Sequence, residues 1–162
     1  MPEQTSTPVR EEVVVDVPVE RAFEVFTTEM GSWWPPEHHI LQGELAEMVL
    51  EPEVGGRIYD RGTDGTECQW ARVLVWEPPR RLVFSWDITL QWSIETDPDR
   101  TSEVEITFTP EGPARTRVGL EHRNIHRHGD GWEGMHAGVG GAEGWAVGMR
   151  RYASHTSPVG HP

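Results

Sequence analysis

Three segments in the second half of this 162-residue chain alternate apolar and polar residues with a period of two. They are residues 81–87, 102–109 and 116–122, and short turn sequences containing proline, glycine or aspartate separate them. Successive side chains of a β-strand point to opposite faces of a sheet, so this alternation predicts strands with one buried face. Short connections between such strands favour antiparallel pairing. We therefore expect an antiparallel sheet in which Leu82 and Trp86 share one face.

The first half of the chain predicts further strands and one helix. Residues 11–17 have the composition of a strand, and apolar residues then recur at helical spacing over 18–28, behind a proline that suits the first helical turn. Strands are also favoured at 44–51, where a helix fits the pattern as well, and at 57–61 and 66–76. Residues 88–93 are candidates for an extension of the strand that begins at residue 81.

The long segment 66–76 has one awkward feature, because Arg72 falls on the same face as Trp70. A β-bulge places two residues of one strand opposite one residue of its neighbour, and it changes which side chains face inward. A bulge near Ala71 would let Trp70 and Val73 both point to the interior.

The last forty residues change character and favour helices. Residues 132–139 and 142–154 are the candidates, and a Gly-Gly pair separates them. Trp145 and Met149 lie on one helical stripe. Glycine costs about 1 kcal/mol relative to alanine inside a helix. We therefore expect close packing to offset the cost of Gly144 and Gly148.

Length and charge limit the classes of protein to be considered. A chain of this length predicts one domain, here residues 11–154, between a disordered tail at 1–10 and a flexible tail at 155–162. The formal net charge of −13 argues against binding to nucleic acids, and no apolar run is long enough for membrane insertion. Cys68 is the only cysteine, so no internal disulfide can form. Because a signal peptide is not evident, we expect a cytoplasmic protein.

Several longer motifs resemble the START-like (SRPBCC) superfamily, in the branch related to the C-terminal domain of the heat-shock chaperone ATPase activator. The motifs are VDVPVERAFEVFT at 15–27, SWWP at 32–35, EPEVGGRIYD at 51–60, QWARVLVWEPPRRLVFSW at 69–86, SEVEITFTP at 102–110, TRVGLEH at 116–122 and GWAVGMRRYA at 144–153. The resemblance implies an α+β helix-grip fold, in which a curved antiparallel sheet wraps around a C-terminal helix. It also implies a cavity between sheet and helix.

Candidate ligand-binding residues follow from this cavity and from the eight tryptophans of the chain. Large aromatic side chains concentrate in cores and pockets. We expect the first group to line the cavity and the second group to lie at its mouth, as a lid or as a hydrophobic plug. The first group is Trp70, Trp86, His122, Trp145 and Met149, and the second is Trp33, Trp34 and His39.

His122 has two interpretations. The alternation of 116–122 points its side chain inward, where it could hold a ligand oxygen or move a proton. Alternatively, it is a structural histidine bonded to a backbone carbonyl, which we favour. His126, His128 and His136 follow nearby, but their spacing does not match a known metal motif. We therefore expect no metal and no cofactor.

Three functions remain open at this point. The first is a protein that binds a small apolar or aromatic molecule without catalysis, since no catalytic motif is visible. The second is an enzyme resembling polyketide cyclases and aromatases, with His122 or a nearby carboxylate as acid or base. The third is an interaction module resembling the chaperone cofactor. The chain has no room for the second, chaperone-contacting domain of that activator, which argues against the third. A homodimer is left open.

Overall fold

The computed structural model describes residues 6–156 except 36, 37, 40, 42 and 143. Seven strands in this part of the chain form one antiparallel sheet with the order β1-β7-β6-β5-β4-β3-β2. They are β1 (Val9–Val15), β2 (Leu45–Leu50), β3 (Arg57–Gly62), β4 (Glu67–Glu77), β5 (Arg81–Trp86), β6 (Ser102–Pro110) and β7 (Thr116–Arg123).

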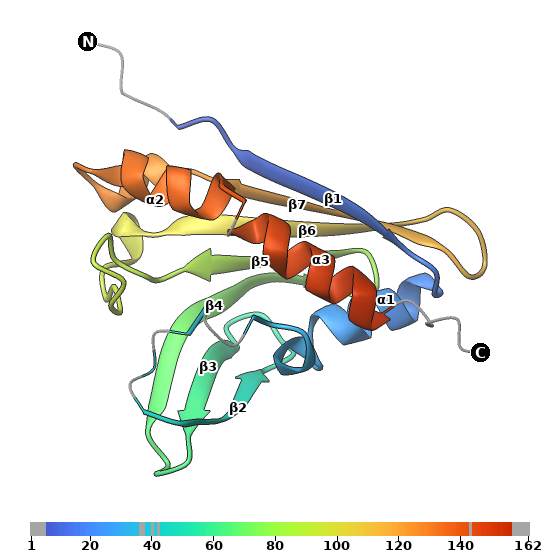
Figure 1. Cartoon of the computed structure of the whole chain (residues 1–162), viewed down its shortest axis with the longest axis horizontal. Coiled ribbons are helices and arrows are strands. Elements are labelled where there is room, and N and C mark those ends of the chain that lie inside the picture. The colour runs from blue at the N-terminus through green and yellow to red at the C-terminus, as the bar shows by residue number, and fades with distance from the viewer. Residues whose placement is uncertain (1–5, 36–37, 40, 42, 143, 157–162) are drawn as a thin grey trace.

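Helices cover one side of this sheet. In Figure 1 the sheet bends between β5 and β4, and α2 and α3 lie across its inner side. The helices are α1 (Val19–Phe26), α2 (Trp132–Gly140) and α3 (Trp145–Thr156), and the short 3-10 turns are η1 (Met30–Ser32), η2 (Pro98–Arg100) and η3 (Ile125–His128). The curved antiparallel sheet with a C-terminal helix confirms the expected helix-grip fold. None of the helices in the described part of the chain has the length and apolarity needed to cross a membrane.

The alternation in the sequence defines the inner face of the sheet. Along β6 and β7, every second side chain is buried. Phe84 of β5 pairs with Val104 of β6, and Val104 pairs with His122 of β7, so these three residues form a row across the sheet. The expected inward direction of His122 is therefore confirmed, and its side chain is fully buried.

A β-bulge in β4 turns Trp70 toward the interior. Ile58 of β3 pairs with Ala71, and the next pair is Tyr59 with Gln69, so Trp70 is the extra residue. Trp70 and Val73 are both buried. This confirms the bulge expected near Ala71.

Helix α1 and helix α3 meet over the sheet through aromatic contacts. Phe26 of α1 packs against Tyr152 of α3 with ring centroids 5.0 Å apart, and the Tyr152 hydroxyl donates a hydrogen bond to the Ala22 carbonyl at 2.8 Å. Phe26 also packs against Trp33, which follows η1. These contacts form one end of the core, and the pocket described below lies at the other end of α3.

Some element boundaries differ from the sequence-based expectations. Strand β1 begins at Val9 rather than at residue 11, and it pairs along its full length with β7. Helix α3 begins at Trp145, not at residue 142, and continues to Thr156. Parts of the expected tails, residues 1–5 and 157–162, lie outside the described residues.

The expected extension of β5 through residues 88–93 is not present. The strand ends at Trp86, and the chain folds back on itself with a single bridge between Ile88 and Ile94. Trp92 within this turn has a positive φ of 60°. A left-handed residue at this position is incompatible with an extended strand through residues 88–93.

Candidate functional site

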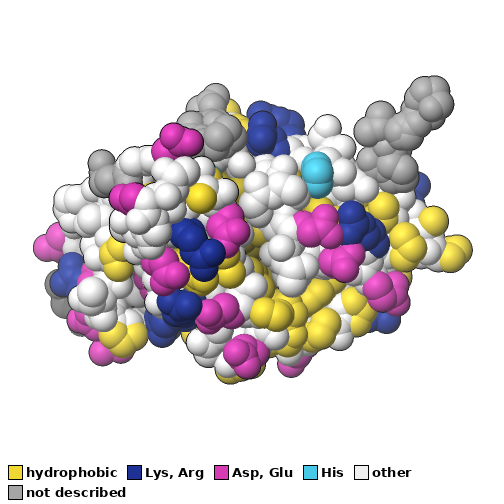
Figure 2. Space-filling view, turned by 90° about the horizontal axis from the view of Figure 1, so that it is seen from below, with side chains coloured by type: hydrophobic (Ala, Val, Ile, Leu, Met, Phe, Trp, Pro, Cys, Tyr) yellow, Lys and Arg dark blue, Asp and Glu magenta, His cyan; other side chains and the backbone are white. Residues whose placement is uncertain are grey.

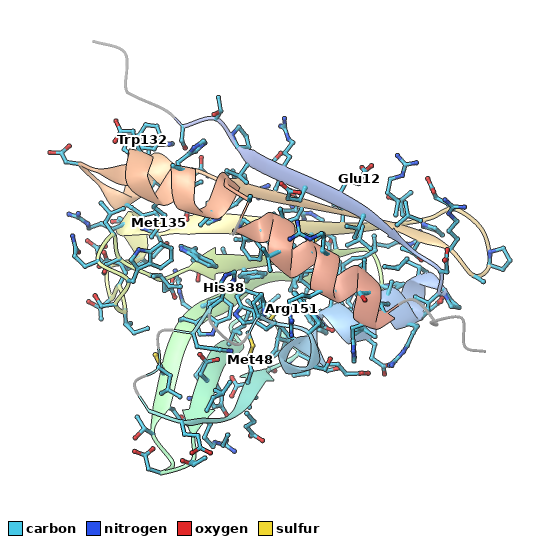
Figure 3. All side chains as sticks on the ribbon, viewed as in Figure 1. Glu12, His38, Met48, Trp132, Met135 and Arg151 are labelled. Atoms are coloured by element: carbon cyan, nitrogen blue, oxygen red, sulfur yellow. The ribbon has the colours of Figure 1, made fainter. Side chains whose placement is uncertain are left out.

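A pocket of about 390 Å³ lies between the inner face of the sheet and the junction of α2 with α3. Strands β3, β4 and β5 form its floor, the segment after η1 forms one wall, and the turn after β5 forms another. The lining residues are Trp34, Pro35, His38, His39, Asp60, Trp70, Trp86, Ile88, Trp92, Gly138, Val139, Gly144, Trp145 and Gly148. Figure 3 shows His38 in the middle of the molecule, between α3 and the strands.

Four indole rings contact one another around this pocket. The ring of Trp34 lies 5.2 Å from that of Trp70 and 5.6 Å from that of Trp145, between centroids. Trp86 completes the set, at 5.8 Å from Trp70 and 5.5 Å from Trp145. Tilted and edge-on rings at these separations attract each other, and their packing fixes their orientation. The result is a rigid aromatic surface that suits a flat apolar molecule.

Two polar atoms among these rings are buried without a hydrogen-bond partner in the described part of the chain. One is Oδ1 of Asp60, and the other is the indole nitrogen Nε1 of Trp86. Leaving a buried polar atom unpaired costs about 1–3 kcal/mol. Both residues line the pocket, but these two atoms are themselves buried, so a bound molecule would reach the acceptor at Asp60 and the donor at Trp86 only after a shift of the neighbouring side chains.

The second oxygen of Asp60 is held by a histidine. His39 Nδ1 lies 2.8 Å from Asp60 Oδ2, and Asp60 is only 1% exposed. A carboxylate is rarely buried without a partner, so this contact is what allows Asp60 to lie in the pocket. The nearby thiol of Cys68 has its pKa raised, first by burial and second by the negative charge of Asp60.

His122 lies behind the pocket rather than in its lining. Its Nδ1 accepts a hydrogen bond from Trp145 Nε1 at 3.0 Å, and its Nε2 lies 2.7 Å from Ser102 Oγ. Ser102 Oγ also lies 2.8 Å from His128 Nε2. Since the indole only donates, His122 carries its proton on Nε2 and donates it to Ser102, which in turn donates to His128. The partners of His122 are therefore side chains and not the backbone carbonyl that the sequence suggested.

Burial keeps both histidines neutral. It lowers the pKa of His122 to about 3, with a smaller contribution from His128, and lowers the pKa of His128 to about 4. His126 and His136 bond to Ser6 and Thr7 instead. Among the residues described, no group of three His, Cys, Asp or Glu side chains is arranged to hold a metal ion.

The structure brings five of the eight predicted residues to the pocket lining: Trp34, His39, Trp70, Trp86 and Trp145. The other three lie deeper. Trp33 packs on Phe26 and Tyr152, Met149 is buried in the core, and His122 is the partner of Trp145. The lid role of the segment after Trp33 stays a prediction, and residues 40 and 42 within it lie outside the described residues.

Asp60 is a polar lining residue that the sequence-based predictions missed, as is His38. Asp60 lies on β3. It is two residues from Ile58 in a strand, and both are buried. This alternation was available in the sequence and places Asp60 on the inner face. Ile88, Trp92 and Val139 were also missed, because the turn after β5 and the end of α2 reach the pocket only through the tertiary fold.

Comparison with known families gave a match over most of the chain. The model of the family described as activator of Hsp90 ATPase homolog 1-like protein matches residues 16–146. The chain belongs to this family. Among solved structures, Txn09, an anthrahydroquino-γ-pyrone synthase, is similar to this chain. The two have 44% sequence identity and a TM-score of 0.65, and the alignment covers 95% of this chain and 99% of Txn09.

Two further solved structures share the fold. CalC from Micromonospora echinospora, described as a self-sacrificing resistance protein, has 25% identity and a TM-score of 0.65, covering 92% of this chain and 93% of its own. Protein NE0264 from Nitrosomonas europaea has 16% identity and a TM-score of 0.63, covering 91% and 92%, and supports the fold alone. A comparison with curated proteins gave no match. The resemblance to the START-like superfamily is confirmed by the family match.

Proposed function

We propose that this protein binds a flat polycyclic aromatic molecule carrying hydroxyl and carbonyl oxygens in the tryptophan-lined pocket. The observation that supports it is the combination of four packed indole rings with two unpaired polar atoms, Asp60 Oδ1 and Trp86 Nε1. The rings offer apolar surface to a planar ring system. Asp60 can accept a hydrogen bond from a phenol, and Trp86 can donate one to a quinone-type carbonyl.

The size and polarity of the pocket agree with this ligand class. Small-molecule pockets span about 300–1,000 Å³ and combine apolar walls with a few placed polar groups. The pocket here has about 390 Å³. The related synthase is named for an anthrahydroquino-γ-pyrone, which is a fused aromatic system bearing oxygens. That name supports the same ligand chemistry for this chain.

Binding can be measured with anthraquinone and 2-hydroxyanthraquinone, because both should quench tryptophan fluorescence from within the pocket. The Trp70→Leu variant removes one of the four indole rings around the pocket. It should weaken binding about tenfold, which corresponds to about 1.4 kcal/mol. The matched control is Trp132→Leu, on α2 and outside the pocket lining, which should leave affinity unchanged. If neither quinone gives saturable quenching, the proposal is wrong.

A second candidate is catalysis of pyrone-ring closure on such a molecule. The observation that favours it is the 44% identity to the γ-pyrone synthase over nearly the full length of both chains. Incubation with an uncyclised anthrahydroquinone precursor, followed by detection of the pyrone, separates a catalyst from a carrier. A carrier would bind the precursor and leave it unchanged.

A further inference from the structure

Asp60 and His39 form a hydrogen-bonded pair, and each side chain contributes one of its two polar atoms to the contact. Asp60 Oδ2 contacts His39 Nδ1 at 2.8 Å. Asp60 Oδ1 has no hydrogen-bond partner among the described residues, and the contact with Asp60 uses Nδ1 of His39 and leaves Nε2 outside it. Both residues line the pocket, and the side chain of His39 is the more exposed of the two. The pair therefore places a histidine ring, backed by a buried carboxylate, at a site that is otherwise largely apolar.

The carboxylate determines which nitrogen of His39 carries the proton. A carboxylate accepts hydrogen bonds, so Asp60 Oδ2 requires a proton on His39 Nδ1. The neutral ring then has its lone pair on Nε2. A carboxylate that fixes a histidine in this way also stabilises the positive charge that appears when Nε2 takes up a proton. This is the arrangement of a general base.

We propose that His39 and Asp60 act together as the proton acceptor for a hydroxyl group of the bound molecule. This proposal rests on the function proposed above, because it requires a hydroxylated ligand among the indole rings. His39 Nε2 takes the proton and Asp60 positions His39. The O–H bond of the ligand breaks, an N–H bond forms at His39 Nε2, and the electron pair stays on the ligand oxygen as a phenolate. The imidazolium then lies against the Asp60 carboxylate, and the proton later returns to the ligand or to water.

The surroundings of the pair favour this proton transfer. Cys68 of β4 pairs with Asp60, and His38 is a further titratable residue in the lining of the pocket. The pKa of the Cys68 thiol is raised by burial and by Asp60, so it stays neutral and does not compete for a proton. Met48 of β2 is the pairing partner on the other side and carries no charge.

The test uses 2-hydroxyanthraquinone, whose anion absorbs at longer wavelength than the neutral form, and anthraquinone, which has no hydroxyl group. When the hydroxylated probe is bound to the natural protein, the pKa of its hydroxyl group should be at least about one unit lower than in solution. This is a tenfold change in the ionisation equilibrium. The His39→Gln and Asp60→Asn variants should lose this shift, and anthraquinone binding, measured alongside, shows whether each variant retains the pocket. The control His155→Gln removes an exposed histidine on α3 and should keep the shift.

The outcomes separate the two proposals. If both quinones bind to the natural protein and the hydroxylated probe keeps its solution spectrum and pKa, the proton-accepting pair is refuted and the proposed function survives. If neither quinone binds, the proposed function fails and the pair loses its substrate. If the shift persists in His39→Gln, another group accepts the proton, which also refutes the pair. If a variant does not fold, an unshifted spectrum and pKa of the probe on the natural protein still refute the pair.

Discussion

The hydrogen-bond chain from Trp145 through His122 and Ser102 to His128 explains how an inward-facing histidine is tolerated in the core. Each link is between 2.7 and 3.0 Å long, and three of the four residues are polar and buried. Because the chain ends on the indole of Trp145, it also fixes the orientation of one wall of the pocket. His122 is thus placed as a positioning residue for the site, through Trp145.

The depressed pKa values of His122 and His128 predict a loss of stability in mild acid. Both values, about 3 and about 4, lie below the usual value of 6.5. Between pH 6.5 and 5 the unfolded chain binds protons at these histidines and the folded chain does not, so stability is complete above pH 6.5 and falls as the pH decreases. The expected slope is at most about 1.4 kcal/mol per pH unit for each histidine.

Urea unfolding at several pH values between 5 and 7 measures this slope. A His128→Gln variant should flatten it by up to one histidine's contribution, and His155→Gln, at an exposed position, should leave it unchanged. This interval lies above the usual pKa of carboxyl groups, so their protonation contributes little. Equal stability at pH 5 and pH 7 in the natural protein would contradict the prediction.

The junction of α2 and α3 depends on one glycine. A Cβ atom at Gly144 would lie 2.2 Å from the Val139 carbonyl oxygen and 2.5 Å from that of Gly138. Both are backbone atoms, so the helices would have to separate to make room. The close packing expected from the sequence is therefore found at Gly144, which lies just before α3 and allows this helix to start beside the end of α2, with Trp145 in the pocket lining. At Gly148, inside α3, an added Cβ would meet only ring atoms of Trp145 and Trp33 at 3.9 Å, which is an ordinary contact.

Two glycine-to-alanine substitutions test this junction against helix propensity. Gly144→Ala should destabilise the protein by more than about 1 kcal/mol and disturb quinone binding, because the added methyl group meets the backbone. Gly134→Ala, in the exposed part of α2 with no atom within 4 Å of the added Cβ, should stabilise it by about 0.5–1 kcal/mol. Thermal melting measures both changes. If Gly144→Ala left the melting temperature unchanged, the two helices would be able to separate without a cost in stability, which would contradict the prediction.

The surface distributes its charges without a basic region on the face shown in Figure 2, where arginine and acidic side chains are interspersed. Many arginines pair with carboxylates, such as Arg72 with Asp87 at 2.9 Å and Arg10 with Glu121 at 3.0 Å. The remaining excess is acidic, with a formal net charge of −13. Homodimer formation stays open, and the argument against a chaperone partner stays a prediction.

Duplex DNA should show no saturable binding to this protein at physiological salt. Binding to the phosphate backbone depends on neutralisation by arginine and lysine, and here acidic residues outnumber them by 27 to 14. A gel-shift titration with a random-sequence duplex measures this, with a basic DNA-binding protein as the positive control. Salt-sensitive, saturable retardation would contradict the prediction.

Local pattern was sufficient to predict most of the elements. The period of two in β5, β6 and β7 and the helical stripe of α3 depend only on neighbouring residues, and the inner row that includes Phe84 and His122 follows from them. The turn after β5 was not predictable in this way. Its apolar residues suit a strand, but the chain folds back at Ile88, and Ile88 and Trp92 line the pocket together with residues of other elements.

The chemistry of the pocket was decided by the tertiary structure. The indole rings of Trp34, Trp70, Trp86 and Trp145 come from distant parts of the chain, and packing alone brings them together. His39 and Asp60 are 21 residues apart, and their hydrogen bond exists only because the tertiary fold brings the segment after η1 against β3. Sequence periodicity states which side of a strand or helix is buried. It does not state which buried side chains meet, because that depends on the register of the sheet and on how the helices pack across it.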